Sequence, residues 1–253
     1  MRTHIALLLA AFVLAGCNQH ANAPASSESS KAAAPPVDQV TAGTITGVVH
    51  FLGTPPQPVK IDMGLDPACN MAADPNYSEQ VVAKDGKLAN VYVYIKSGLT
   101  PHSYPPPAEP LTITQKGCRY EPHVAAARTG ETIRVINADP AMHNIHPAPK
   151  VAGNHEWNLS QMPKGDPIER SFDAPEVLMP VKCNQHPWMK MYLNLADNPY
   201  YAITNTEGAF QIADLPPGDY TLAAVHEKYG EKDITVHIAP KQSQQVSFDF
   251  NSQ

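Results

Sequence analysis

"CNQHPWM", residues 183–189, places a cysteine, a histidine and a methionine at steps of three residues. Thiolate and thioether sulfur are soft donors that suit copper, and imidazole suits copper and zinc. Pro187 and Trp188 fill the gap between the last two of these residues. By itself the cluster is consistent with a copper site, with a zinc pair of Cys183 and His186, or with core packing by Met189.

A second motif, "HNIH" at residues 143–146, lies upstream, with His143 40 residues before Cys183 (183 minus 143). We expect Cys183, His186 and Met189 to lie in a loop that joins two adjacent strands, with a distant strand end supplying His143. Two imidazoles, a thiolate and a weak thioether are the ligand set of a type-1 copper site. The two motifs together therefore favour copper over zinc.

The two motifs resemble those of the cupredoxins, and most closely the amicyanin type, whose ligand loop has the form C-x-x-H-x-x-M. The resemblance covers roughly residues 110–196. It implies that Asn144 braces the cysteine loop by hydrogen bonding, and that the imidazole of His186 faces solvent. It implies four copper ligands: His143, Cys183, His186 and Met189.

Three neighbouring residues qualify this interpretation. Pro180 lies three residues before Cys183 and cannot donate a hydrogen bond to a strand partner, so irregular strand pairing is expected there. His146 is expected to be a packed or exposed neighbour of the site. His123 remains a candidate for an additional metal-binding or gating residue, and its role stays open.

The remainder of the chain predicts an all-β fold. Of its 253 residues, 43% are hydrophobic, which is enough for one or two packed domains, and 26 prolines disfavour long helices. Residues 64–75 are the one weak helical candidate, expected to form a loop or a single turn. Short β-branched and aromatic runs bounded by turn residues predict strands: TITGVVHF, NVYVYIK, PLTITQK, ETIRVIN, YTLAAVH, DITVHIA and QVSFDF.

The strands at the two ends of the chain resemble halves of one domain. Residues 42–98 and 199–253, with "GTITGVVHF" and "DLPPGDYTL", are similar to the carboxypeptidase regulatory-like family, a small prealbumin-like β-sandwich. Residues 99–198 interrupt this similarity. We therefore expect a split sandwich that carries a cupredoxin-like Greek-key β-sandwich as an insert.

The first residues predict export. Residues 1–17 have one arginine, an apolar run and then L-A-G-C, the layout of a signal peptide with a lipobox, in which Cys17 becomes a lipid anchor. A plain signal peptide with an incidental Cys17 is the alternative. Residues 18–41, rich in Ala, Ser and Pro, are expected to form a flexible linker. We expect a periplasm-facing lipoprotein of the cell envelope, anchored to the outer membrane.

Cysteine counting separates Cys183 from the others. With Cys17 assigned to lipid, Cys69 and Cys118 remain, both in turn-like sequence, and an exported protein meets oxidising conditions. We expect these two to form a disulfide, which leaves Cys183 as the thiol available for metal.

The function expected from the sequence is electron transfer by copper, without enzymatic activity. The chain has no catalytic triad pattern, phosphate loop or paired-carboxylate motif. Loss of Arg2 with the signal takes the net charge from −6 to −7, which disfavours nucleic acid and suits a basic redox partner such as a c-type cytochrome. A periplasmic copper carrier or buffer, and a non-redox binding or adhesion module, remain alternatives.

Overall fold

The structure is a computed structural model that describes residues 32–35, 38, 40–70 and 76–252. The expected signal peptide, Cys17 and most of the expected linker lie outside the described residues. Among the residues that are described, no helix is both long enough and apolar enough to cross a bilayer. The all-β prediction is confirmed, because the described part of the chain consists of strands and one short helix, α1 (Pro67–Asn70).

One β-sandwich, here called the terminal sandwich, is built from both ends of the chain. Its first sheet has the order β15-β1-β3-β2 with β18 also paired to β1, and its second has the order β14-β4-β16-β17. The strands are β1 (Gly43–Leu52), β2 (Ala83–Lys84), β3 (Lys87–Leu88), β4 (Tyr92–Ser97), β14 (Tyr201–Ile203), β15 (Ala209–Leu215), β16 (Gly218–His226), β17 (Gly230–Ile238) and β18 (Ser243–Asn251).

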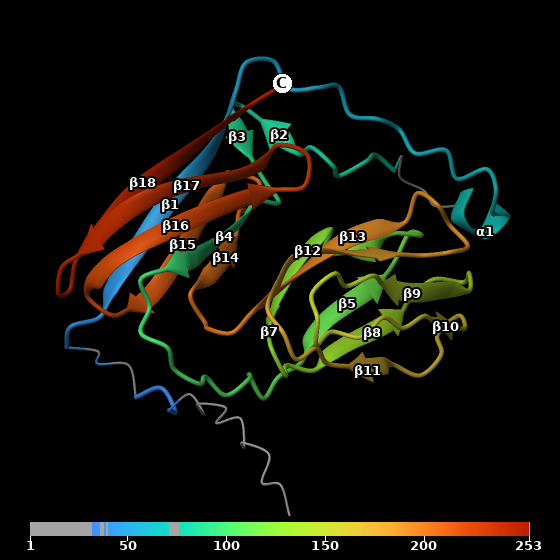
Figure 1. The fold of residues 1–253 in the computed structure, drawn as a ribbon. Helices are drawn as coiled ribbons and strands as arrows, with labels where there is room; N and C mark the ends of the chain where they lie inside the picture. Colours follow the sequence, from blue (N-terminus) through green and yellow to red (C-terminus); the bar gives the residue numbers. More distant parts are fainter. Residues whose placement is uncertain (1–31, 36–37, 39, 71–75, 253) are drawn as a thin grey trace, which may run out of the picture. The chain divides into compact units, whose positions relative to one another are not determined.

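Strand β1 shows how the two ends meet. It runs parallel to β18, from Thr44 opposite Ser243 to Leu52 opposite Asn251, and antiparallel to β15. In Figure 1 the blue β1 accordingly lies beside the red β18. Side chains of β1 alternate between buried and partly exposed, as expected for a strand with one face on a core. The core of this sandwich draws buried residues from both segments, for example Val49, Val93 and Phe248.

The second sandwich, here called the central sandwich, lies between these segments in the sequence. Its sheets have the orders β10-β9-β12-β13-β7 and β11-β8-β5-β6. A separate core fills it, with buried residues from both sheets such as Ile113, Val135, Met179 and Leu193. The strands are β5 (Leu111–Gln115), β6 (Tyr120–Glu121), β7 (Val124–Arg128), β8 (Ile133–Asn137), β9 (His143–Pro147), β10 (Leu159–Gln161), β11 (Ile168–Arg170), β12 (Glu176–Lys182) and β13 (Lys190–Ala196).

Strand β12 is irregular, but at Leu178 and not at Pro180, where the sequence predicted the irregularity. Its register with β13 shifts between Glu176 and Met179, and Leu178 adopts a positive φ of 51°. The backbone N–H of Leu178 donates to Oδ1 of Asn194, 2.8 Å away, so a side chain replaces the strand partner that this N–H loses in the bulge. Pro180 itself stays in register opposite Tyr192. The last residues of β12 therefore enter the loop at 183–189 from regular pairing.

Candidate metal centre

Antiparallel pairing of β9 with β12 brings the two sequence motifs together. Lys182, the last residue of β12, lies opposite His146 of β9. Because the strands run in opposite directions, the start of β9, His143, lies beside the loop that follows Lys182. The strand that supplies His143 is thus the direct neighbour of β12 and not a distant one.

The loop at 183–189 is closed by two backbone hydrogen bonds. The N–H of Met189 donates to the carbonyl of His186 (2.8 Å), and the N–H of Cys183 donates to the carbonyl of Met189 (3.0 Å). The first bond closes a four-residue turn with Pro187 in its second position, where the fixed φ of proline is favourable. These bonds fix the backbone from which the Cys183 and His186 side chains project.

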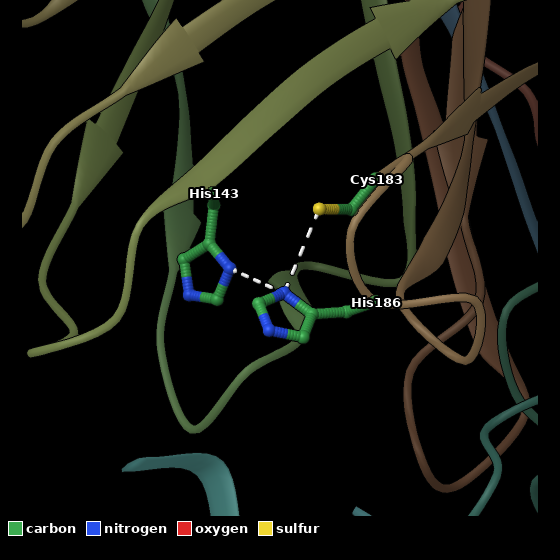
Figure 2. Close-up of side chains that lie close together, drawn as sticks. All are labelled: His143, Cys183 and His186. Carbon is green, nitrogen blue, oxygen red and sulfur yellow. Dashed lines mark hydrogen bonds between the residues drawn. The ribbon is translucent and has the colours of Figure 1, made fainter. Parts of the chain in front are cut away.

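Three donor atoms converge at one point. Nδ1 of His143 lies 3.0 Å from Nδ1 of His186, which lies 3.6 Å from Sγ of Cys183. Figure 2 shows the Nδ1 atoms of His143 and His186 facing each other. Sγ of Cys183 is directed at Nδ1 of His186. All three residues are buried, and their ligand atoms lie within 4.8 Å of one another.

The far nitrogen of His143 has a carboxylate partner. Nε2 of His143 lies 2.9 Å from Oδ2 of Asp139, which also accepts the backbone N–H of Cys118 at 2.8 Å. Oδ1 of Asp139 accepts the N–H of Gly117 at 2.7 Å. A carboxylate on the far nitrogen holds a histidine's tautomer and orientation for metal binding. Asp139 therefore leaves Nδ1 of His143 directed toward the other donors.

His186 does not face solvent, so the expectation from the cupredoxin resemblance is wrong on this point. The residue is only 2% exposed. Its Nε2 lies 3.0 Å from Oδ2 of Asp66 and 3.6 Å from Sγ of Cys69. The Trp188 ring packs against it with centroids 5.2 Å apart. The physical reason is that a segment far away in the sequence, around α1, covers the imidazole edge.

Asn144 braces the cysteine loop, as the resemblance implied. Its Oδ1 accepts the backbone N–H of Asn184 at 2.7 Å and lies 3.2 Å from Sγ of Cys183. Its Nδ2 donates to Oδ1 of Asn158 at 2.6 Å, which fixes the amide orientation. The side chain is buried, so these bonds hold the loop in a site without solvent competition.

Burial and hydrogen bonding shift the pKa values of Cys183 and His143 in opposite directions. Burial raises the pKa of the Cys183 thiol, but hydrogen bonds with His143 and with backbone N–H groups of Asn144, Gln185 and His186 outweigh it and lower the pKa to about 6. Burial lowers the pKa of His143, but its hydrogen bonds with Asp139 and Cys183 outweigh it and raise the pKa to about 9. At neutral pH the metal-free site therefore contains a thiolate beside an imidazolium.

This pair predicts a pH dependence of metal binding. A metal needs the thiolate and an unprotonated Nδ1, so between pH 6 and 9 one proton, that of His143, must leave. Copper affinity is expected to rise about tenfold per pH unit across this window, more steeply below it, and to level off above it. Chelator competition between pH 6.5 and 8.5, corrected for protonation of the chelator, measures the slope. A flat profile would contradict the imidazolium–thiolate pair.

The other residues singled out in the sequence lie outside the converging donors. Met189 is fully buried in the core that also contains Cys183, and its thioether as fourth ligand stays a prediction. His146 contacts Glu156 and Oδ1 of Asn184 and belongs to none of the metal-ligand groups among the described residues. His123 is buried against Glu227 and likewise lies outside these groups in the described part of the chain.

Cys69 and Cys118 are joined in a disulfide, the pairing expected from the sequence. Within the described residues, two further candidate ligand groups contain one of these sulfurs each, Asp66–Cys69–His186 and Cys118–Asp139–His143. A half-cystine has no thiolate to offer a metal, so neither group competes with the site formed by His143, Cys183 and His186.

Sequence reasoning missed Asp66 and Asp139. Asp139 lies four residues before His143 in the polar turn "ADPAMH", a local spacing from which it could have been proposed. Asp66 lies 120 residues from His186 and no local pattern connects the two.

The donor set fits copper. The separations of 3.0 Å between the two nitrogens and 3.6 Å between nitrogen and sulfur are shorter than the sum of two metal–ligand bonds, roughly 4 Å in each case. One ion can therefore contact all three atoms. Two imidazoles with one thiolate and a neighbouring methionine are characteristic of blue copper, whereas structural zinc sites use four Cys or His ligands.

No protein-family model and no curated protein matches the chain. Among solved structures, it is similar to a purple cupredoxin from Nitrosopumilus maritimus (21% identity, 34% of this chain and 99% of that one, TM-score 0.29). It is also similar to a methionine-to-alanine mutant of amicyanin in its Cu(I) form (20% identity, 41% of this chain and 98% of that one, TM-score 0.30). A third similar structure is a copper-containing nitrite reductase from Thermus scotoductus (20% identity, 55% of this chain and 28% of that one, TM-score 0.32). Because these TM-scores are low, the functional proposal rests on the geometry of the site.

Proposed function

We propose that the chain binds one copper ion through His143, Cys183 and His186, with Met189 as a fourth, axial ligand, and transfers single electrons. The observation that carries the proposal is the convergence of Nδ1, Nδ1 and Sγ at one buried point. Copper, when bound, supplies the Cu(II)/Cu(I) couple. The chain's own contribution is to hold donors that suit both oxidation states in a fixed arrangement.

Burial favours a resident redox centre over a copper carrier. His143, Cys183, His186 and Met189 are each no more than 3% exposed. Electron transfer proceeds through packed atoms, whereas handing on an ion requires the donors to become accessible. A carrier would therefore have to open the segment that covers His186 at each exchange.

A redox partner would meet side chains around His186 rather than its imidazole, because that imidazole is buried. Two of the side chains in contact with His186 reach toward solvent: the Asp66 side chain, which is 31% exposed, and the partly buried Trp188. We propose that a basic partner, such as a c-type cytochrome, approaches there and benefits from the acidic charge of the chain.

The remaining parts of the proposal concern where the protein works. Export, lipid attachment at Cys17 and a periplasmic, outer-membrane location are proposed from the N-terminal sequence. The terminal sandwich is proposed as a carboxypeptidase regulatory-like scaffold without peptidase activity, since the H-E-x-x-H pattern does not occur in the sequence.

Voltammetry combined with a chelator challenge separates electron transfer from copper delivery. The copper-loaded protein is expected to give a reversible one-electron wave and to lose its metal to excess chelator slowly. A protein that accepts only Cu(I) and releases it rapidly would overturn the electron-transfer proposal in favour of the carrier.

A further inference from the structure

The segment at residues 61–70, here called the cap segment, covers the His186 side of the metal centre. It belongs to the connection between β1 and β2 and contains α1. Met63 and Cys69 of the cap segment are buried in a small cluster with Cys118 and Ala141, against which Trp188 packs. The Cys69–Cys118 disulfide fixes the cap segment covalently to the loop between β5 and β6.

Asp66 uses its two carboxylate oxygens for different purposes. Oδ1 accepts the backbone N–H of Ala68 at 2.8 Å, which holds the local turn. Oδ2 faces Nε2 of His186 at 3.0 Å. The side chain is 31% exposed while that of His186 is 3% exposed, so the carboxylate stands between the imidazole and water.

The cap segment has no structural need for a negative charge at Oδ2. Asparagine is as good as aspartate at holding the N-terminus of a helical turn through its side-chain oxygen. What asparagine cannot provide there is the negative charge that favours a proton on Nε2 and an unprotonated Nδ1. The contact that distinguishes aspartate from asparagine is therefore the one to His186.

The two ligand imidazoles are held in the same way. Asp139 contacts Nε2 of His143 and accepts the N–H of Cys118, while the carbonyl of Asp66 accepts the N–H of Cys69 at 3.1 Å. Each carboxylate residue is thus hydrogen-bonded to the backbone of one half-cystine. The disulfide consequently ties the position of one carboxylate to that of the other.

We propose that Asp66 is a positioning residue of the metal centre that acts through His186. It fixes the tautomer with Nδ1 free to bind metal, and its negative charge stabilises Cu(II) more than Cu(I), which lowers the reduction potential. This inference rests on the proposed function, because it assumes that copper occupies the site.

The test compares three variants of the full chain. Asp66→Asn keeps the turn but removes the charge, and Asp66→Glu restores a carboxylate. Asp62→Asn removes an equal charge from an exposed residue of the same segment, whose side chain accepts the N–H of Gly64. Asp66→Asn is expected to shift the Cu(II)/Cu(I) equilibrium about tenfold toward Cu(I), which is about 59 mV for one electron. Asp66→Glu should recover at least half of the shift, and Asp62→Asn should show none.

A second readout needs no copper. Nitrogen NMR of metal-free protein reports which nitrogen of His186 carries the proton. Parent protein should show the proton on Nε2, and Asp66→Asn should show a mixture.

The outcomes separate the two proposals. The protein could bind copper while Asp66→Asn changes the reduction potential no more than Asp62→Asn does. That result would overturn the role of Asp66 and leave the copper function intact. Failure of the parent chain to bind copper would overturn the proposed function, and the NMR result would then decide whether Asp66 positions His186.

Discussion

Replacing His143 by alanine is expected to lower the Cu(II) affinity of the protein by well over 100-fold. The loss should exceed the roughly 10–100-fold cost of removing a partner outside the ligand set, because His143 would itself bind the metal. Its Nδ1 is one of the three converging donors, and the residue is fully buried, so the variant loses a donor from the interior of the site. Competition with a chelator of known affinity measures the change.

His146→Ala is the matched control for this variant. His146 lies on the same strand three residues later and contacts Glu156 and Asn184 rather than the other donors. Its removal should change the affinity less than about threefold. Equal losses from the two variants would contradict the assignment of His143.

A metal-free measurement on the folded His143→Ala variant tests the contact between His143 and Cys183. The low pKa of Cys183 depends in part on its hydrogen bond with His143. The variant should therefore show a thiol pKa above about 6, measured from the ultraviolet absorbance of the thiolate during a pH titration. An unchanged thiol pKa in a folded variant would show that the two side chains do not interact.

Replacing both Cys69 and Cys118 by alanine is expected to lower the free energy of unfolding by about 4 kcal/mol. The disulfide closes a loop of sequence separation 49, and the entropy of loop closure in the unfolded chain gives this magnitude. Urea denaturation of metal-free parent and double variant measures the difference. Cys183→Ala is the control, since it removes the remaining cysteine in the described residues without opening a loop.

The double variant should also change the metal centre in the same direction as Asp66→Asn. Without the disulfide, the cap segment is held to the central sandwich by the packing of Met63 and its neighbours and by the contact between Asp66 and His186. The contact between Asp66 and His186 then forms only part of the time. A large stability loss with an unaltered copper potential would show that the cap segment stays in place without its covalent link.

The strands and the loop at residues 183–189 could be predicted well from the sequence because both depend on local patterns. Alternating side chains in β1 and β8 give the buried–exposed alternation found in the structure. Cys183 and His186 are three residues apart, so a single loop brings them together. Asn144 follows His143 directly, and its position next to the cysteine loop comes from the pairing of β9 with β12.

The cover over His186 could not be predicted, for a physical reason. Whether an imidazole edge meets solvent depends on every segment that packs against it, and Asp66 arrives from the connection between β1 and β2, 120 residues away. The disulfide was predicted from cysteine counting, but counting gives no information about which surface Cys69 would cover. A resemblance limited to residues 110–196 could not include a segment outside that range.

The central claim is that Cys183, His143 and His186 form a copper site with a thiolate ligand. Adding Cu(II) to the purified protein and recording visible absorption and electron paramagnetic resonance tests it most directly, with Cys183→Ser as the comparison. The structure predicts an intense thiolate-to-copper charge-transfer band in the parent that disappears in the variant. A colourless parent, or a band that survives in Cys183→Ser, would contradict it.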